Sequence, residues 1–453
     1  MPATSAVRPE VTREPRMARA AARGLAIAVV LVGAAFAVPP LTGWNVHASG
    51  VLRHTAAPLY AAWDPHLGIG TPFALLLAWA GVGHGHRLAE RLEWRRLLGA
   101  TYAAGLAWAL ALAFVSGPSG LSRATSSHGE YLFSARRVDG LHAMLQGYVA
   151  RIPLGSPGGW PTHPAGHPPG ALLFFVVLVR TGLGDPFVAG LLITLIGVSM
   201  PIAVLVTMRA LGQEALARQA APYLVLTPAA LWIAVSADAL FGTVGAWGVA
   251  LVAVAATTQH TRTRWGAAAG GGLLLGLLPT LSYGLVLYAT LPIAVLIVTR
   301  AWRILPVVAV VALLPVLALA GGGFVWWEAY PVLRDRYWAG IAHDRPASYW
   351  LWGDLASLLV CAGPMVGAGL ASVVARGREV PSAVRLLVGA AALSVAVADL
   401  SLMSKAEVER IWLPFVPWLL LSTAFLPESW RRRALVGQVV TALLVEHLLL
   451  TGW

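Results

Sequence analysis

The sequence has very little cysteine, lysine or charge. Cys361 is the only cysteine in 453 residues and lies in an apolar run, which excludes an intramolecular disulfide. Lys405 is the only lysine, a bias toward arginine that is typical of GC-rich genomes. Charged residues make up 11% of the chain, against roughly a quarter in soluble domains. With 58% hydrophobic residues and a mean hydropathy of +0.72, the chain is predicted to be an all-α, polytopic membrane protein.

The formal net charge of +12 does not indicate a nucleic-acid partner. The arginines gather in short connections between apolar runs, where the preference for basic residues in cytoplasmic loops explains them. No basic stripe with interleaved aromatic residues occurs, so binding of nucleic acid is excluded. The expected partner of this surface is the lipid bilayer of the plasma (inner) membrane.

A membrane-spanning helix needs roughly 20 apolar residues. The N-terminal run can be an uncleaved span or a signal peptide ending at Ala35-Phe36-Ala37, and we favour the uncleaved span. Together with one short run at 169–183, the candidate spans are 23–40, 68–84, 97–116, 187–208, 219–236, 240–258, 265–281, 284–300, 304–321, 350–375, 383–402, 411–427 and 434–451.

Charge decides how the short run 169–183 is placed. If it crossed the membrane, every later basic connection would lie outside, including 376–378 and 431–433. If it enters and returns on the same side, all of these connections lie inside. We therefore predict 13 spans and one re-entrant or interfacial helix.

This topology defines the predicted organisation of the chain. Residues 1–22 form a cytoplasmic tail, and 23–453 form a single transmembrane domain whose C-terminus lies outside. All segments with unusual polar composition fall on the outer face, which is therefore the predicted functional face. The outer loops are 41–67, 117–168, 321–350 and 399–410.

The first candidate site segment is Ser127–Arg137. A helix that starts at Glu130 places Tyr131 on one face with Ser134 and Val138, in the manner of an interfacial helix. Glu130 at its start is either a helix-capping acid, favoured by the helix dipole, or a general base.

The second segment is GGWPTHPAGHPPG at 158–170, whose four prolines and four glycines predict that it is not helical. His163 and His167 are therefore not expected to align as metal ligands, and a metal site is not predicted. Pro168-Pro169 predicts a helix start, because proline is well tolerated at the first position of a helix. The backbone N–H groups at that start could bind a phosphate, or the segment could be a rigid helix entry without a ligand.

Three acids lie at the outer ends of predicted spans, namely Asp64, Asp238 and Asp399. Ionisable groups at membrane depth usually face a partner or a cavity. Taken singly, each is a helix-end charge exposed to water. Taken together, they line one face.

Two later outer segments combine both charge signs with aromatic residues. Ser404–Pro417 contains Lys405, Glu407, Glu409 and Arg410. These charged side chains either reach toward the membrane surface as snorkelling anchors or, in the case of the cations, bind a phosphate. Residues 323–352 are rich in Trp and Tyr beside Arg345, which indicates an aromatic belt or a platform for carbohydrate or lipid.

These motifs resemble, over roughly residues 120–420, the GT-C class of membrane glycosyltransferases, which includes protein O-mannosyltransferases and aminoarabinose transferases. The resemblance rests on an acid followed by Tyr in the first large outer loop (Glu130-Tyr131), with Ala135-Arg136 after it. It also rests on Pro168-Pro169 at a helix start, on an outer acid after a Pro-containing span (Asp238), and on a late outer cation. Two departures are a lone Glu in place of the usual acid pair or Asp, and two preceding spans instead of one.

The resemblance implies a polyprenyl-phosphate sugar donor, with mannose or arabinose as the sugar, and an envelope glycan, lipid or protein as acceptor. It implies Glu130 as the base and leaves Asp64 as a rival. Cofactors are not required, and a divalent cation, Mg²⁺ or Mn²⁺, stays open. The implied donor-phosphate contacts are Arg410, Lys405, His167 and His163. The implied site-lining residues are Tyr131, Arg136, Asp238, Glu407, Glu409, Asp399 and Arg345.

Two other function classes stay open. A transporter or flippase of a lipid-linked or small envelope precursor would normally carry charged or broken segments at the midplane, often duplicated between halves. Glu446 is the main central charge in this chain, and no internal repeat is evident. A non-catalytic membrane assembly partner would tolerate the loss of Glu130, Asp238 and Arg410 together.

Overall fold

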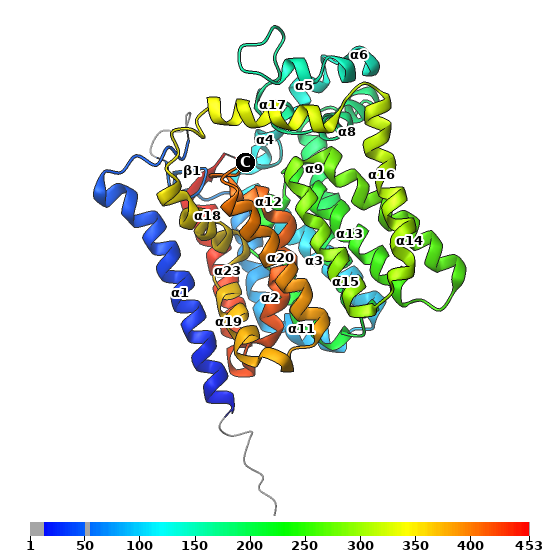
Figure 1. Ribbon diagram of the computed structural model, residues 1–453. Helices are drawn as coiled ribbons and strands as arrows, with labels where there is room; N and C mark the ends of the chain where they lie inside the picture. Colours follow the sequence, from blue (N-terminus) through cyan, green and yellow to red (C-terminus); the bar gives the residue numbers. More distant parts are fainter. Residues whose placement is uncertain (1–12, 50–54, 453) are drawn as a thin grey trace, which may run out of the picture.

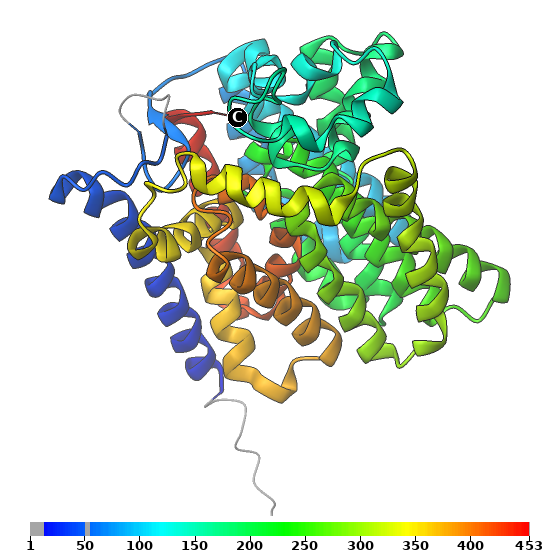
Figure 2. The ribbon, with the colours of Figure 1, turned by 45° about the horizontal axis from the view of Figure 1, so that its top comes forward.

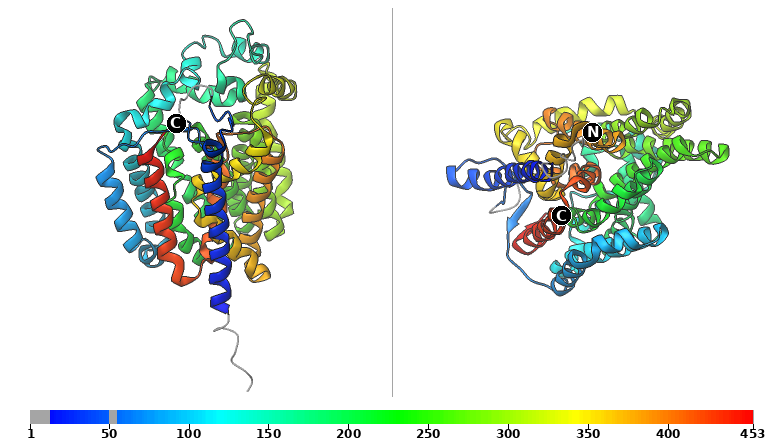
Figure 3. Two further views of the ribbon diagram at one scale, coloured as in Figure 1. Left: turned by 90° about the vertical axis from the view of Figure 1, so that its left-hand side faces the viewer. Right: turned by 90° about the horizontal axis from the view of Figure 1, so that it is seen from below.

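The structure is a computed structural model that describes residues 13–49 and 55–452. Helices run along one main axis and form a bundle, and short helices cover one of its ends (Figure 1; Figure 3, left). The longer helices are α1 (Arg13–Thr42), α2 (Thr71–Arg91), α3 (Trp94–Ala113), α8 (Pro169–Arg180), α9 (Pro186–Gly197), α10 (Met200–Ala210), α11 (Glu214–Val225), α13 (Ala237–Thr257), α14 (Thr261–Leu281), α15 (Thr290–Thr299), α16 (Leu305–Gly321), α17 (Trp326–Ala339), α18 (Ala347–Ala362), α19 (Met365–Arg376), α20 (Ser382–Leu400) and α23 (Arg431–Leu448).

The predicted apolar runs all fall on helical segments, but the predicted count of 13 spans is not reached. Within the described residues, six helices are long and apolar enough to cross a membrane, or up to eight if each of two bent pairs is one span. The runs 219–236 and 284–300 contain only shorter helices, whereas α2 and α14 are unbroken helices of 21 residues that are not among these six. The run 350–375 is divided by Gly363-Pro364 into α18 and α19, which meet at 99°. The predicted re-entrant run is α8, which has only 12 residues and is too short to span a bilayer.

The basic connections meet at one end of the bundle, the end at which α1 begins (Figure 1). Arg218 of α11 donates to the carbonyl oxygens of Ala89 and Leu92 at 2.8 Å each, and the guanidinium of Arg209 lies 4.7 Å from the ring centroid of Trp94. The described chain ends at the opposite end of the bundle (Figure 1).

Helix α13 lies at the centre of the bundle. It packs against α9, α10, α14 and α15, and most of its 21 residues are buried. A helix that is apolar on all sides requires such a central position. Asp238 lies in its first turn, so the centre of the bundle presents a carboxylate at the covered end.

The covered end consists of segments 114–168, which include the short helices α4 (Arg123–Ser126), α5 (Tyr131–Ala135), α6 (Leu141–Gln146) and α7 (Thr162–Gly166). Helix α17 lies across this end between α16 and α18 (Figure 2). Two three-residue strands, β1 (Ala61–Trp63) and β2 (Leu449–Thr451), pair antiparallel there.

Two local predictions are wrong. Residues 162–166 form one helical turn. Pro161 precedes this turn and Pro164 lies within it. The backbone N–H groups at these positions are not needed for the hydrogen bond of a single turn, so proline is tolerated there. The last predicted span, 434–451, ends as a helix at Leu448 and continues as β2. Residues 13–22 of the predicted cytoplasmic tail are the first part of α1, and residues 1–12 lie outside the described part of the chain.

Helix α1 is held mainly by close contact of small residues with α19. A Cβ on Gly24 would lie 2.3 Å from the carbonyl oxygen of Gly367, and a Cβ on Gly367 would lie 2.7 Å from that of Gly24. Such approaches are the usual way in which membrane helices pack when no side chain separates the backbones.

We expect Gly24→Leu to weaken the contact between α1 and α19. Overpacking costs about 1–3 kcal/mol, so the Tm of the purified protein in detergent falls by about 1–3 °C. The matched control is Gly33→Leu, on the same helix, where a Cβ meets nothing within 4 Å. Equal Tm values for the two variants would show that α1 is not held at Gly24.

Candidate functional site

The covered end contains a cluster of charged side chains from four separate segments of the chain. Glu130 precedes α5, His163 lies in α7, Asp238 begins α13, and Arg410 lies in α21 (Val408–Ile411). His163, Asp238 and Arg410 are each less than 9% exposed. The fold therefore brings together four residues that are separated by up to 280 positions in the sequence.

Arg410 is the centre of this cluster. Its Nη1 donates to Asp238 Oδ2 at 2.7 Å, and its Nη2 donates to Glu407 Oε2 at 3.0 Å. Ser236 Oγ also donates to Asp238 Oδ2, at 3.1 Å. A buried guanidinium is tolerated because carboxylates and hydrogen bonds replace the water that it has lost.

The geometry fixes the tautomer of His163. Nη2 of Arg410 lies 3.4 Å from His163 Nδ1, and a guanidinium can only donate, so Nδ1 is the acceptor. The proton of the neutral ring is then on Nε2, which donates to Glu130 Oε1 at 3.2 Å. Burial and the positive charge of Arg410 lower the pKa of His163 well below its usual value, which keeps the ring neutral.

Glu130 is a carboxylate with an unusual environment. Burial raises its pKa to about 7, although Arg410 acts in the opposite direction. Its side chain keeps 15% exposure, so a proton can still reach it from outside the cluster. A carboxyl group that titrates near neutrality beside an orienting histidine can act as a general base.

Aromatic packing holds Glu130 and the histidines in place. Tyr131 is buried and stacks on Phe175 of α8, with ring centroids 5.0 Å apart and planes 10° apart. Tyr148 Oη donates to the carbonyl oxygens of Pro164 and His167, at 2.7 and 3.1 Å. Nδ1 of His167 in turn donates to the carbonyl oxygen of His163 at 3.0 Å. Pro168 caps α8 and Pro169 is its first residue, as the sequence predicts.

The segment 401–407 extends the charged cluster. Arg345 Nη2 lies 3.6 Å from Glu407 Oε1, so Glu407 bridges Arg345 and Arg410. Lys405 Nζ donates to the carbonyl oxygen of Arg345 at 2.7 Å and lies 4.6 Å from the ring centroid of Trp338. Leu402, Ala406 and Glu407 have φ values of 56°, 67° and 62°. Left-handed backbone at three non-glycine residues is strained and is held by the surrounding contacts.

Several predicted site residues lie apart from this cluster. Asp64 is exposed, and its side chain makes no ion pair or hydrogen bond with a described residue. Arg136 is exposed and donates to the carbonyl oxygen of Gly184. Glu409 is buried and accepts from the N–H of Tyr60 at 3.0 Å, which fixes the segment 55–63. Asp399 is buried at the end of α20, and no hydrogen bond of its carboxylate to another described residue is found.

Two residues of the site were not predicted from the sequence. Asp354 of α18 is buried and accepts from the N–H of Ala406 at 2.9 Å, which supports the strained segment. Asp354 could have been predicted from the sequence, because an acidic residue inside an apolar run requires a partner. Tyr148 carried no comparable signal, since a Tyr in an outer loop is also typical of an aromatic belt.

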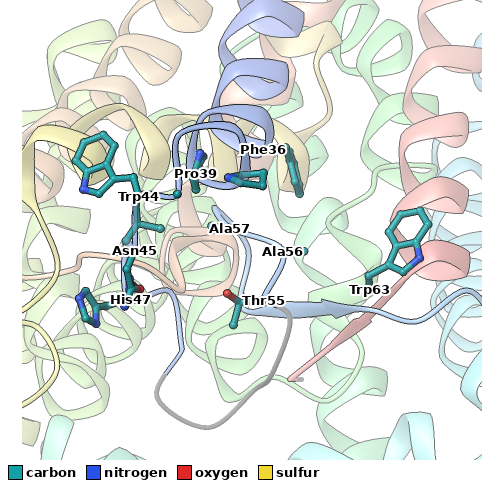
Figure 4. A pocket seen from close by; sticks show the side chains of 12 residues that line it. Phe36, Pro39, Trp44, Asn45, His47, Thr55, Ala56, Ala57 and Trp63 are labelled. Carbon is teal, nitrogen blue, oxygen red and sulfur yellow. Dashed lines mark hydrogen bonds between the residues drawn. The ribbon is translucent and has the colours of Figure 1, made fainter.

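A cavity of about 520 Å³ lies between the end of α1 and β1 (Figure 4). Phe36, Trp44 and Trp63 line it together with Asn45, His47 and Thr55. Its wall is joined to the cluster, because Arg345 donates to the carbonyl oxygens of His47 and Ala48, at 3.1 and 3.2 Å. Within the described parts of the chain, no group of three or more His, Cys, Asp or Glu side chains could hold a metal ion.

Comparisons with protein-family models, with curated proteins and with solved structures find no match for this chain. The interpretation of the site therefore depends on its own geometry.

The raised pKa of Glu130 predicts a pH dependence of stability. Because the folded pKa of about 7 lies above the usual value of 4.5, Glu130 favours the folded state most at low pH. That contribution is lost as the pH rises from about 4.5 to 7. We expect the Tm of the wild type, relative to that of Glu130→Gln, to fall over this range and to level off above it.

The control for this titration is Glu93→Gln, because Glu93 is 78% exposed and lies 3.7 Å from Arg96. Its Tm should follow that of the wild type at every pH. A Tm difference between wild type and Glu130→Gln that does not vary with pH would refute the raised pKa.

Breaking the Arg410–Asp238 ion pair should lower the free energy of unfolding. Asp238→Leu leaves a buried cation with one carboxylate fewer, which typically costs about 3 kcal/mol. The double variant Arg410→Met with Asp238→Leu should lose less than the sum of the two single variants, because no uncompensated charge remains. Chemical unfolding of all four proteins in detergent measures this difference, and strict additivity would rule out a direct pair.

Proposed function

We propose that this protein is a membrane glycosyltransferase that moves a sugar from a polyprenyl-phosphate donor to an envelope acceptor at the covered end of the bundle. The observation that carries the proposal is Glu130, a carboxylate with a pKa of about 7, oriented by a neutral histidine and still partly exposed. On this proposal the covered end is extracytoplasmic, and the basic connections at the opposite end face the cytoplasm.

The proposed reaction needs one base and no general acid. The acceptor hydroxyl oxygen forms a bond to the anomeric carbon of the sugar while its proton passes to Glu130. The bond from that carbon to the phosphate oxygen breaks, and its electron pair leaves with the polyprenyl phosphate. Glycosidases, by contrast, use two carboxyl groups. Direct displacement inverts the anomeric centre.

Glu407 marks the proposed position of the donor phosphate. Its carboxylate lies between the guanidinium groups of Arg345 and Arg410, as a phosphate would, and its side chain keeps 23% exposure. Its φ of 62° lies in the left-handed region, which is strained for a non-glycine residue. Arginine binds phosphate well through its planar fork of donors, and cations stabilise the charge that develops on the leaving group.

The cavity beside α1 supports the same assignment. It lies where α1 ends at the covered end of the bundle, and its aromatic lining suits a sugar or the first part of a lipid chain (Figure 4). Arg345 connects its wall to Glu407, so a ligand in the cavity could place its phosphate at the two arginines.

A transporter of a lipid-linked precursor is the second candidate, because α18 and α19 form a broken helix pair. Broken helices at the binding site are common in transporters. Transport would require binding of the lipid-linked sugar without cleavage of its bond to phosphate.

The test is a transfer assay with purified protein and a panel of radiolabelled polyprenyl-phosphate sugars. We expect Glu130→Gln to bind the donor and to lose at least about 100-fold in transfer rate, as expected for the loss of a general base. Asp64→Asn, the exposed rival, should keep the wild-type rate. Binding of a donor without transfer by the wild type would favour the transporter, and full activity of Glu130→Gln would refute the proposed base.

A further inference from the structure

The groove between α2 and α23 is a second cavity, far along the bundle from the charged cluster. It has a volume of about 400 Å³ and is lined mainly by apolar residues, together with Trp79, His84 and Arg432. Helices α2 and α23 pack side by side (Figure 3, left). Apolar side chains also form the exposed rim of the groove. The exposed fractions are 70% for Trp79, 41% for Val436 and 44% for Val440. In a membrane, such a surface faces acyl chains.

Positive charge surrounds one end of this groove. Arg432 lies there with Arg431 and Arg433, at the start of α23. On α2, Arg87 and Arg91 follow His84 at intervals of three and four residues, so they share its face. Segments 84–91 and 428–433 together hold five arginines against two glutamates, Glu90 and Glu428. Arg432 is exposed, and no ion pair or hydrogen bond joins its side chain to a described residue.

We propose that this groove binds an anionic phospholipid. One acyl chain lies between α2 and α23 against Val436, Val439 and Val440, and the phosphate is held by Arg432 with His84 beside it. Basic pockets between membrane helices commonly bind acidic lipid headgroups in this way. The arginines identify the ligand as anionic, and the apolar groove identifies it as a lipid rather than a free phosphate.

The site is independent of the proposed sugar transfer. It lies toward the end of the bundle at which α1 begins, whereas α5, which follows Glu130, lies at the covered end (Figure 1). Because α23 leads directly into β2, which pairs with β1, a lipid that stabilises α23 would also stabilise the strand pair near the cavity of Figure 4.

The experiment measures lipid binding to the full-length protein by native mass spectrometry and by thermal shift in detergent. The probes are phosphatidylglycerol, phosphatidylcholine and inorganic phosphate, each at several concentrations. We expect phosphatidylglycerol to bind and to raise the Tm, and phosphatidylcholine and inorganic phosphate to have much smaller effects.

Two variants test the two halves of the site. Arg432→Gln should weaken phosphatidylglycerol binding about five-fold, the usual effect of one arginine near an anionic lipid. Val436→Trp fills the groove from its exposed rim and should weaken lipid binding without changing the charge. Arg95→Gln, an exposed arginine at the same end on α3, should bind like the wild type.

Each outcome decides the proposal. Equal binding of phosphatidylcholine and phosphatidylglycerol, or equal weakening by Arg432→Gln and Arg95→Gln, would overturn the headgroup site. An effect of Arg432→Gln with none of Val436→Trp would overturn the acyl groove. Because none of these readouts measures sugar transfer, their failure would leave the proposed enzyme activity unaffected.

Discussion

The buried guanidinium of Arg410 is the constraint on which the arrangement of the covered end depends. A cation in such a place is stable only if carboxylates replace its lost hydration, and Asp238 and Glu407 do so from two different segments. The same guanidinium faces His163 and so assigns the imidazole proton to the nitrogen that meets Glu130. One charge therefore positions the central helix α13, the strained segment 401–407 and the proposed base.

The strained backbone at 402–407 follows from the same requirement. Glu407 has to reach both Arg345 and Arg410, and its φ of 62° places its carboxylate between them. The carboxylate of Asp354 accepts a hydrogen bond from the neighbouring N–H of Ala406, and the ammonium of Lys405 donates one to the carbonyl oxygen of Arg345. The strain is thus balanced by contacts to charged groups rather than by packing alone. In the proposed function, a phosphate would replace the Glu407 carboxylate between the two guanidinium groups.

The sequence predicted the helical fold and much of the cluster because both depend on local signals. Hydropathy marks apolar helices, and acids or arginines beside such helices are rare enough to stand out, so Glu130, His163, Asp238 and Arg410 were all named. The predictions failed where the outcome depends on three-dimensional packing. Asp64 and Asp238 look alike in the sequence, yet Asp64 is exposed and Asp238 pairs with Arg410. The predicted count of 13 spans is not confirmed, because the hydropathy of a run does not show where its helix ends, as at Val225 within the run 219–236.

The separation of charge between the two ends of the bundle accounts for both proposed sites. At the end where α1 begins, the arginines of 87–91 and 431–433 are mostly exposed and have few acidic partners, so they are suited to lipid headgroups. At the covered end, Arg345 and Arg410 are buried and already paired with carboxylates. A ligand can therefore bind their guanidinium groups only if it replaces a carboxylate. An exposed arginine attracts any anion nearby, whereas a buried and compensated one selects an anion of the right size and charge. On the two proposals, the chain would use the same residue type for general attraction to the membrane at one end and for selective recognition of a phosphate at the other.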